Sequence, residues 1–107
     1  DTIPYETKRV FYLFDVPSGA KRGGHANKKT NQVLIAISGS FDVVLKDGKS
    51  KEIVKLNRPD KGLLIENNIW RELENFSSGS VCLVLASEEF SEDDYIRNYK
   101  EYLSFVK

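Results

Sequence analysis

Apolar and polar residues alternate in several short segments of this chain. In residues 41–46 every second position is apolar, and the pair Asp47-Gly48 follows directly. Alternation that ends in Asp-Gly is typical of a β-hairpin, because these two residues tolerate the positive φ angles of a tight turn. Residues 41–46 and 51–57 are therefore predicted to pair as neighbouring antiparallel strands.

Other segments rich in β-branched and aromatic residues predict further strands. Residues 8–16 stop at a Pro-Ser-Gly turn, and a second extended region runs from His25 to Gly39 after a break at Gly23-Gly24. Short strands at nearly regular spacing, joined by polar turns, indicate an all-β sandwich or barrel. The remaining predicted strands are residues 62–66, 70–76 and 81–88.

Only the C-terminal segment has helical periodicity. Ser91 is a plausible N-cap, and the acidic residues 92–94 suit the positive end of a helix dipole. We expect the apolar face of this helix to pack on the barrel or on a second subunit, in preference to acting as an aromatic recognition surface. That face consists of Tyr95, Ile96, Tyr99, Tyr102, Leu103 and Val106.

Composition narrows the function classes. The 107 residues fit one domain, residues 1–107, and 16 cationic and 16 anionic side chains leave no overall field that would attract nucleic acid. No apolar run reaches the roughly 20 residues of a membrane span. The N-terminus lacks a signal-peptide core, so a cytoplasmic protein without a membrane partner is expected. The lone Cys82 lies in an apolar run and is expected to pack in the core.

The segment RGGHANKK, residues 22–29, contains the only histidine, His25. A single histidine on a strand is often structural, but two adjacent glycines allow close backbone approach and the neighbouring cations suit a phosphate. Period-two geometry places Asn27 on the same strand face as His25. From the residues alone, a catalytic and a structural role of His25 both remain open.

Four segments that cover nearly the whole chain resemble the cupin-type nucleoside-diphosphate-sugar 3,4-ketoisomerases, which act on TDP-4-keto-6-deoxyglucose. The resemblance implies a small cupin (jelly-roll) β-barrel with one C-terminal helix, and a homodimer that exchanges N-terminal strands. Family members carry another strand or two before the segment that matches residues 8–14, so this domain is expected to lack them. The matching segments are KRVFYLFDVPSG, RGGHANKKTNQVLIAISGSFDVVLKDG, LNRPDKGLLIENNIWRELENFSSGSVCLVLASE and DDYIRNYKEYL.

The resemblance also bears on metal binding. Metal-binding cupins use a His-x-His pair, a Glu and a later His, and this sequence offers His25, Asn27, Gln32 and Arg71 on that pattern. Only His25 is a good ligand, because amide oxygens are weak and a guanidinium repels a cation. We expect no metal and no cofactor. Gln32 and Arg71 are instead expected to point into the barrel and touch sugar or phosphate.

The implied activity moves a keto group from C4 to C3 of a TDP-linked 6-deoxyhexose through an enediol, in deoxy-amino-sugar synthesis for a surface polysaccharide such as lipopolysaccharide or an S-layer glycan. A neutral imidazole with an ordinary pKa of about 6.5 suits the general base, so His25 is assigned that role. The family motif is RGxHAHK, and Asn27 replaces its second histidine. Asn27 is expected to donate a hydrogen bond to the developing oxyanion. Two alternatives are a catalytically impaired cupin that binds a TDP-sugar as a binding or regulatory module, and a purely structural dimerisation domain.

Four more residues are candidates for substrate binding. Arg22 precedes the glycines, and Arg9 lies on the first predicted strand, so either could hold the diphosphate. Tyr12 could donate a hydrogen bond to the sugar or serve only in packing. Trp70 could stack on the thymine or seal the core, and the core is the favoured alternative.

Overall fold

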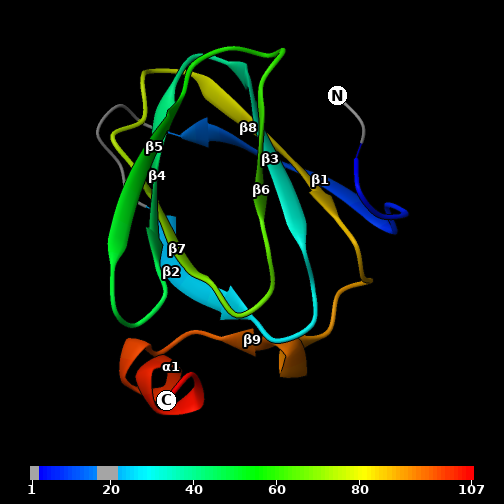
Figure 1. Ribbon diagram of the computed structural model, residues 1–107. Helices are drawn as coiled ribbons and strands as arrows, with labels where there is room; N and C mark the ends of the chain where they lie inside the picture. Colours follow the sequence, from blue (N-terminus) through cyan, green and yellow to red (C-terminus); the bar gives the residue numbers. More distant parts are fainter. Residues whose placement is uncertain (1–2, 17–21) are drawn as a thin grey trace.

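Two antiparallel sheets face each other and form a flattened barrel (Figure 1). The computed structural model describes residues 3–16 and 22–107. The four-stranded sheet has the order β1 (Arg9–Val16), β8 (Ser80–Ala86), β3 (Gln32–Ser38), β6 (Gly62–Ile65). The five-stranded sheet has the order β5 (Lys51–Leu56), β4 (Phe41–Lys46), β7 (Trp70–Glu74), β2 (Arg22–Asn27), β9 (Tyr95–Ile96).

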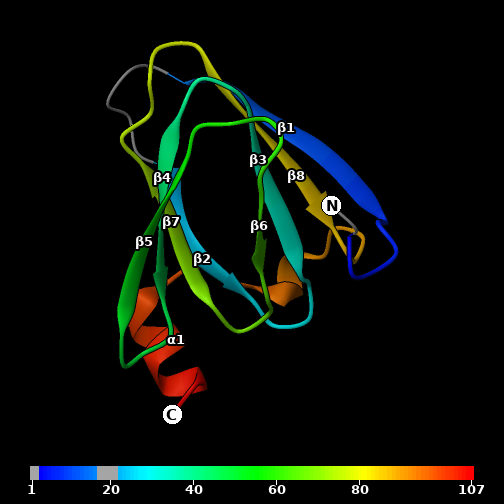
Figure 2. The same cartoon turned by 45° about the horizontal axis from the view of Figure 1, so that its top comes forward.

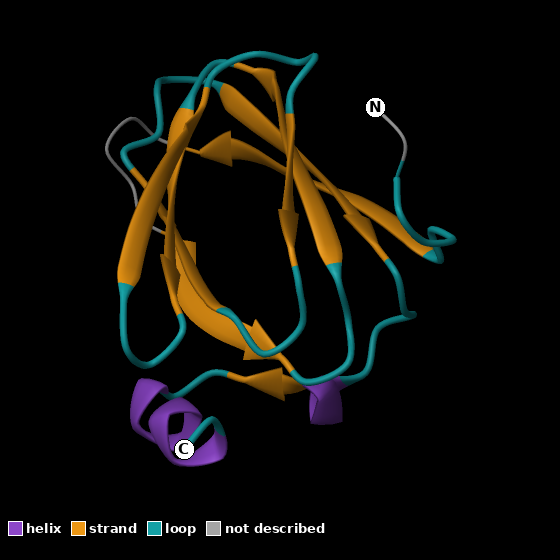
Figure 3. Ribbon diagram, in the orientation of Figure 1, coloured by secondary structure: helices purple, strands orange, loops and turns teal. Residues whose placement is uncertain are grey.

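Two short helices complete the fold at one end of the barrel. The 3-10 helix η1 (Glu92–Asp94) precedes β9, and the α-helix α1 (Tyr99–Phe105) follows it (Figure 3). The prediction of an all-β protein with a C-terminal helix is therefore confirmed. No helix in residues 3–16 and 22–107 is long and apolar enough to cross a bilayer.

Strand alternation divides the barrel interior into an apolar core and a polar end. In β3 the buried Gln32 is followed at two-residue intervals by Leu34 and Ala36, and in β7 the buried Arg71 is followed by Leu73. In both of these strands the first inward-facing residue is thus polar, and the inward-facing residues that follow it are apolar. The main core comprises Leu34, Ala36, Phe41, Val43, Leu56, Ile65, Leu73, Phe76, Cys82 and Val84.

The lone cysteine belongs to this core. Cys82 has an exposed fraction of 0%, and burial raises the pKa of its thiol to about 12. A thiol that stays protonated at neutral pH behaves as a small apolar group. The expectation that Cys82 packs in the core is confirmed.

A second cluster joins α1 to the outer face of the five-stranded sheet. Trp70, Ala26, Ile96 and Tyr102 are buried together there. The Trp70 ring meets Tyr99 edge-on, with 5.0 Å between the ring centroids. Figures 1 and 2 both show α1 beyond the end of this sheet, so the helix packs on the barrel as expected.

Hydrogen bonds from one tyrosine hold α1 in this place. The Tyr102 hydroxyl lies 3.1 Å from the carbonyl oxygen of Lys46 and 2.7 Å from that of Asn68. These carbonyls belong to the end of β4 and to the turn before β7, respectively. Tyr102 therefore satisfies its buried hydroxyl and links the helix to two neighbouring strands.

The predicted start of the C-terminal helix at Ser91 is wrong. Ser91 makes no side-chain cap bond, whereas the Asn98 side chain accepts hydrogen bonds from the backbone N–H groups of Lys100 and Glu101. The helix therefore begins at Tyr99, and residues 95–96 pair instead with β2 as β9. Because Tyr95 and Ile96 pair with Asn27 and Ala26 of β2, they are extended, and the helix cannot start before them.

Gly23-Gly24 does not separate two strands as predicted, because both glycines lie inside β2, but the pairing register of β2 with β7 shifts there, between Arg22 and His25. The single extended region expected from His25 to Gly39 is two strands, β2 and β3, joined by residues 28–31. Gly24 is needed for packing: a Cβ there would lie 2.4 Å from Cζ2 of Trp70. The Asp47-Gly48 hairpin between β4 and β5 is confirmed, and Gly48 has a φ of +97°.

We predict that Gly24→Ala destabilises the protein by about 1 to 3 kcal/mol, as overpacking does. The methyl group would collide with the indole of Trp70, which is itself held by Tyr99 and Tyr102. Urea denaturation of Gly24→Ala, Trp70→Phe and the double variant measures this. The smaller phenyl ring should make the double variant less destabilised than the sum of the two single changes. Strictly additive losses would contradict the contact.

Candidate active site

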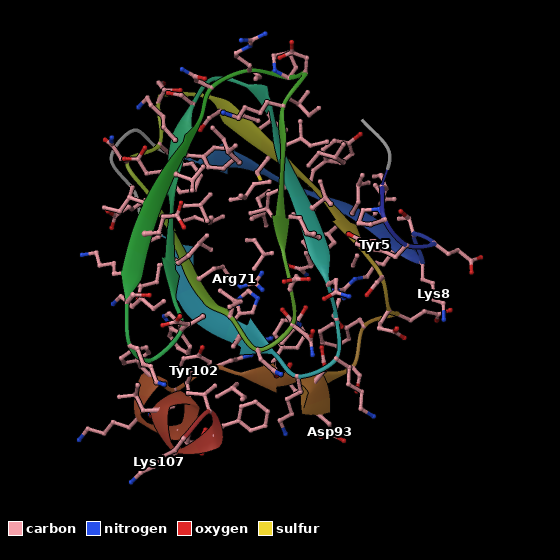
Figure 4. The ribbon with its side chains drawn as sticks, in the orientation of Figure 1. Tyr5, Lys8, Arg71, Asp93, Tyr102 and Lys107 are labelled. Carbon is pink, nitrogen blue, oxygen red and sulfur yellow. The ribbon has the colours of Figure 1, made fainter. Side chains whose placement is uncertain are left out.

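Four polar side chains from three strands converge at the polar end of the barrel. His25 and Arg71 are directly paired across β2 and β7, and Asn27 follows His25 on the same strand face. Arg71 Nη1 donates a hydrogen bond of 2.5 Å to Gln32 Oε1, which joins β7 of one sheet to β3 of the other. Figure 4 shows Arg71 between the two sheets. The structure thus brings together the four residues that the sequence grouped.

Arg71 is a buried cation without a full set of partners. Its exposed fraction is 2%, and its Nε and Nη2 atoms have no hydrogen-bond partner among the described residues. Burial lowers the pKa of Arg71 to about 10, against the opposing effects of Tyr95 and Asp94, so the guanidinium stays charged at neutral pH. A buried charge with free donors is stabilised when an anionic group enters beside it.

His25 is held in its neutral form. Burial, and then the charges of Arg71, Arg97 and Arg9, lower the pKa of the imidazole to about 3, while the neighbouring Asn27 side chain acts to raise it. The Nε2 atom is buried and has no hydrogen-bond partner among the described residues. Such an imidazole has an unpartnered nitrogen that can serve as a base, but a proton on it is disfavoured unless a counter-charge forms nearby.

Asn27 presents its amide differently from our expectation. Its exposed fraction is 0%, and its Nδ2 atom donates a 3.0 Å hydrogen bond to Oδ2 of Asp94. Oδ1 has no hydrogen bond of normal geometry among the described residues, and the Asn27 side chain acts to raise the pKa of His25. The bond to Asp94 uses one of the two N–H groups of the amide, so the expected role of Asn27 as a donor to the oxyanion stays a prediction, and Oδ1 is in addition available as an acceptor.

A group of rings and arginines lies next to His25. The Tyr95 ring has its centroid 5.0 Å from that of His25, and its hydroxyl accepts a 2.9 Å hydrogen bond from Nη2 of Arg9. The guanidinium of Arg97 lies over the Tyr95 ring, with its carbon atom 4.4 Å from the ring centroid. Arg9 therefore lies beside His25 and Tyr95, and its expected role in holding the diphosphate stays a prediction.

Three residues of this site were not predicted from the sequence. Asp94 and Tyr95 were assigned to a helix, and Arg97 was not singled out. All three come from the segment DDYIRNY that carried part of the resemblance. A usable signal was Asn98, an alternative N-cap that would have released residues 92–97 from the helix.

Two predicted site residues lie elsewhere, and a third is not placed. Tyr12 is 55% exposed and lies on the opposite face of β1 from Arg9. Trp70 is 3% exposed and packs under α1, in keeping with the favoured core role. The side chain of Arg22 lies outside the described part of the structure.

The residues at the site do not form a metal-ligand set. Among the described residues, no three His, Cys, Asp or Glu side chains lie together as a metal site would require. The Arg71 guanidinium, at one former ligand position, carries a positive charge beside His25. The donor set therefore does not fit a divalent cation.

Comparison with known proteins places this geometry in a family. All 107 residues, 1–107, match the family model for WxcM-like, C-terminal proteins (FdtA). The chain belongs to this family. A curated relative, the TDP-4-oxo-6-deoxy-alpha-D-glucose-3,4-oxoisomerase of Aneurinibacillus thermoaerophilus, is 41% identical over 104 residues, which are 97% of this chain and 75% of the relative.

Solved structures in the family share the fold. The WlaRB TDP-quinovose 3,4-ketoisomerase of Campylobacter jejuni has a TM-score of 0.91 and 53% identity, over 95% of this chain and 78% of that one. The sugar 3,4-ketoisomerase QdtA of Thermoanaerobacterium thermosaccharolyticum, in complex with TDP, has a TM-score of 0.94 and 45% identity, over 97% and 76%. The cupin-type barrel is confirmed, and the chain is an enzyme of the keto-sugar isomerase kind.

We predict that His25 makes stability depend on pH below about pH 6.5. The folded-state pKa is about 3, whereas an unfolded histidine titrates near 6.5. The stabilisation is complete above pH 6.5 and is lost as the pH falls toward 3, with a slope of up to about 1.4 kcal/mol per pH unit.

Urea denaturation of the wild type and His25→Gln at pH 7.5, 6.5 and 5.5 measures this effect. The variant lacks the titrating group. The unfolding free energy of the wild type minus that of His25→Gln should therefore decrease as the pH is lowered from 7.5 to 5.5. Other titrating groups are common to both proteins and cancel. Parallel pH profiles would show that His25 is protonated as readily in the folded as in the unfolded state.

Proposed function

We propose that this protein converts TDP-4-keto-6-deoxyglucose to a TDP-3-keto-6-deoxyhexose with His25 as the general base. The relatives named above as 3,4-oxo- or ketoisomerases support this reaction type. The observation that carries the assignment of residues is the pairing of a neutral imidazole, free at Nε2, with a buried guanidinium that has two free nitrogen atoms. A base beside a fixed cation is what proton removal next to a ketone requires.

In the first step the imidazole of His25 takes the proton from C3 of the sugar. The electrons of the C3–H bond form a C3=C4 double bond, and the C4 carbonyl oxygen becomes an oxyanion. The free N–H groups of Arg71 are suited to bind that oxyanion. Donors already in place need no reorganisation when the charge develops, which is why such sites lower the barrier.

The same step resolves the charge problem at His25. A proton on the imidazole is disfavoured in the free protein by Arg71, Arg97 and Arg9. During the reaction an equal negative charge forms on the neighbouring substrate, so the imidazolium gains a counter-charge when it is created. An anionic diphosphate bound nearby would raise the pKa of His25 further toward neutrality.

The second step returns a proton to C4, and the C3 hydroxyl loses its proton to leave a ketone at C3. One proton is added at C4 for the one taken from C3, and the hydroxyl proton goes to the oxygen at C4. The carbon skeleton undergoes no net oxidation, so the reaction needs no external electron acceptor. The His25 imidazole is the proton carrier in this scheme.

We also propose how the substrate is bound, where the protein acts and in which oligomeric state. Arg9 and Arg22 hold the diphosphate, and the complex of QdtA with TDP supports a TDP-linked substrate.

The protein acts as a cytoplasmic homodimer, and its 3-keto product is suited to amination on the way to a surface polysaccharide such as lipopolysaccharide or an S-layer glycan. Val10 and Tyr12 on the sheet edge at β1 are exposed apolar residues, and they support a subunit contact there.

The binding-module alternative was motivated by Asn27 in place of a second histidine. The family relatives are named as isomerases, so this alternative is not favoured. It differs from the proposed function in one respect, because it requires TDP-sugar binding without proton exchange.

We predict that in heavy water the protein converts TDP-4-keto-6-deoxyglucose to the 3-keto isomer and that deuterium enters the sugar at C3 of the substrate or at C4 of the product. His25→Gln should lose this activity by about a hundredfold or more, because an amide cannot take up a proton near neutral pH. The measurement is NMR of the sugar at C3 and C4. Asn27→His, run alongside, tests whether a second imidazole raises the rate. Stabilisation by TDP without any exchange would instead support the binding module.

We predict that Arg71→Lys lowers kcat by about a hundredfold, with a smaller effect on KM. Lysine keeps the charge but loses the planar arrangement of N–H groups that bonds Gln32 and faces the oxyanion. Steady-state kinetics measure both constants. Arg58→Lys is a matched control, since Arg58 is exposed and, within residues 3–16 and 22–107, forms its ion pair with Asp60 on the surface away from His25. Equal kinetics for the Arg71→Lys variant and the wild type would remove Arg71 from the reaction.

A further inference from the structure

Asp94 gathers several hydrogen bonds from the strand end that carries His25 and from the turn after it. Its Oδ2 accepts from Asn27 Nδ2 at 3.0 Å and from Thr30 Oγ1 at 2.6 Å, and its Oδ1 accepts from the backbone N–H of Lys29 at 2.6 Å. Its carbonyl oxygen accepts from the backbone N–H of Lys28 at 2.8 Å. Burial acts to raise the pKa of Asp94, but the hydrogen bonds from Thr30 and Asn27 outweigh it and hold the pKa below its ordinary value.

An ionised carboxylate can only accept hydrogen bonds. Asn27 must therefore present its NH2 group to Asp94, and its Oδ1 atom lies on the other side of the amide. Asn27 is completely buried, so solvent does not offer a competing partner, and Oδ1 has no hydrogen bond of normal geometry among the described residues. The charge on Asp94 thus determines which end of the Asn27 amide faces the site.

The side chain that shares this strand face with Asn27 is His25. The charged groups around the imidazole come from three other segments: Arg71 on β7, Arg9 on β1, and Arg97 just after β9. All three disfavour a protonated ring, and the phenol of Tyr95 lies against it. The Asn27 amide is the neighbour that favours the protonated form, as an acceptor oxygen does.

We propose that Asp94 is a positioning residue for the isomerisation: it orients the Asn27 amide with its oxygen toward His25, and so determines which imidazole nitrogen carries the proton. The inference rests on the proposed function, since it assigns Asp94 a part in that reaction. With the proton held on the nitrogen beside Asn27, the other nitrogen has its lone pair available for C3 of the sugar. When His25 becomes cationic, the same oxygen supports it.

A purely structural role of Asp94 would be to tie residues 28–30 to η1. Thr30 provides the comparison, because it bonds the same carboxylate oxygen as Asn27 but is not next to His25 in the strand. If Asp94 only anchors the turn, loss of the Thr30 bond and loss of the Asp94 charge should perturb His25 alike. If Asp94 orients Asn27, only the second change should do so.

An exchange of the two groups separates orientation from anchoring. In Asp94→Asn, the new amide must direct its NH2 either at the Lys29 N–H, where two donors would meet, or at Asn27. The second arrangement makes Asn27 turn over and point its own NH2 at His25. In the double variant Asn27→Asp with Asp94→Asn, a carboxylate at position 27 accepts from the new amide and again presents an oxygen to His25.

The test is 15N NMR of the imidazole at neutral pH, which is unambiguous because His25 is the only histidine in the chain. We expect one dominant neutral tautomer in the wild type, a shifted tautomer balance in Asp94→Asn, and recovery in the double variant. Thr30→Val should keep the wild-type tautomer. In turnover of TDP-4-keto-6-deoxyglucose, kcat should fall at least about tenfold in Asp94→Asn with KM little changed, while Thr30→Val should keep the wild-type kcat.

Two results would overturn the inference. One is an unchanged tautomer balance in Asp94→Asn, and the other is an equal change in Thr30→Val, which would reduce Asp94 to an anchor of the turn. The NMR needs no substrate, so it decides the orientation of Asn27 even if the wild type fails to exchange deuterium. Absence of deuterium exchange in the wild type would count against the proposed function. An altered tautomer with unaltered kcat would count only against the role of Asp94 in the reaction.

Discussion

The buried guanidinium of Arg71 is the interaction around which this end of the barrel is organised. It reaches from β7 to Gln32 on β3 and so crosses the space between the two sheets. A charge in that position is costly unless its donors are satisfied, and two of its nitrogen atoms are not satisfied by the described residues. Leu73, the next inward residue on β7, lies in the apolar core, and strand geometry leaves Arg71 no other face to occupy. Core packing therefore supplies the rigidity that keeps the cation in place.

The state of His25 follows from this cation and from burial. Arg71 pairs with His25 across adjacent strands, and Arg97 and Arg9 add to its effect, so the imidazole is neutral in the free protein. A base of such low pKa is weak by itself. In the proposed reaction an oxyanion forms beside Arg71 as His25 takes up its proton, so the two charges appear together. The arginines that suppress protonation of His25 in the free protein are thus, in this proposal, also the groups that would stabilise the negative charge formed when a proton leaves the neutral ketone.

Much of this arrangement was accessible from the sequence because it depends on local periodicity. Period-two spacing places His25 with Asn27, and the resemblance identified Gln32 and Arg71 as further inward positions. The same rule argues against two of the expected residues. Tyr12 is separated from Arg9 by an odd number of positions, and Trp70 is adjacent to Arg71, so within a regular strand each lies on the face opposite its partner. Both do so in the structure.

The C-terminal segment was less predictable because its structure is determined by distant contacts. Ser91 with three acidic residues is a reasonable helix start, and nothing local excludes it. The hydrogen bonds of Asp94 with residues 27–30, and the pairing of Tyr95–Ile96 with β2, are stronger constraints, and Asn98 caps the helix that remains. Sequence periodicity carries no information about such partners, which lie more than 60 residues away along the chain.

These contacts give a physical meaning to the residue at position 27. The Asp94 carboxylate needs a donor there, and His25 is best supported by an acceptor on the same side chain. Asparagine meets both needs, because one end of its amide donates and the other accepts. A neutral imidazole also has one donor and one acceptor nitrogen, so histidine at this position can meet the same pair of demands, whereas an apolar residue would leave the Asp94 carboxylate without one of its donors. Asn27 is therefore compatible with the hydrogen-bonding pattern of the site. What it lacks relative to histidine is the capacity to carry a proton, so in the proposed mechanism proton transfer falls to His25 alone.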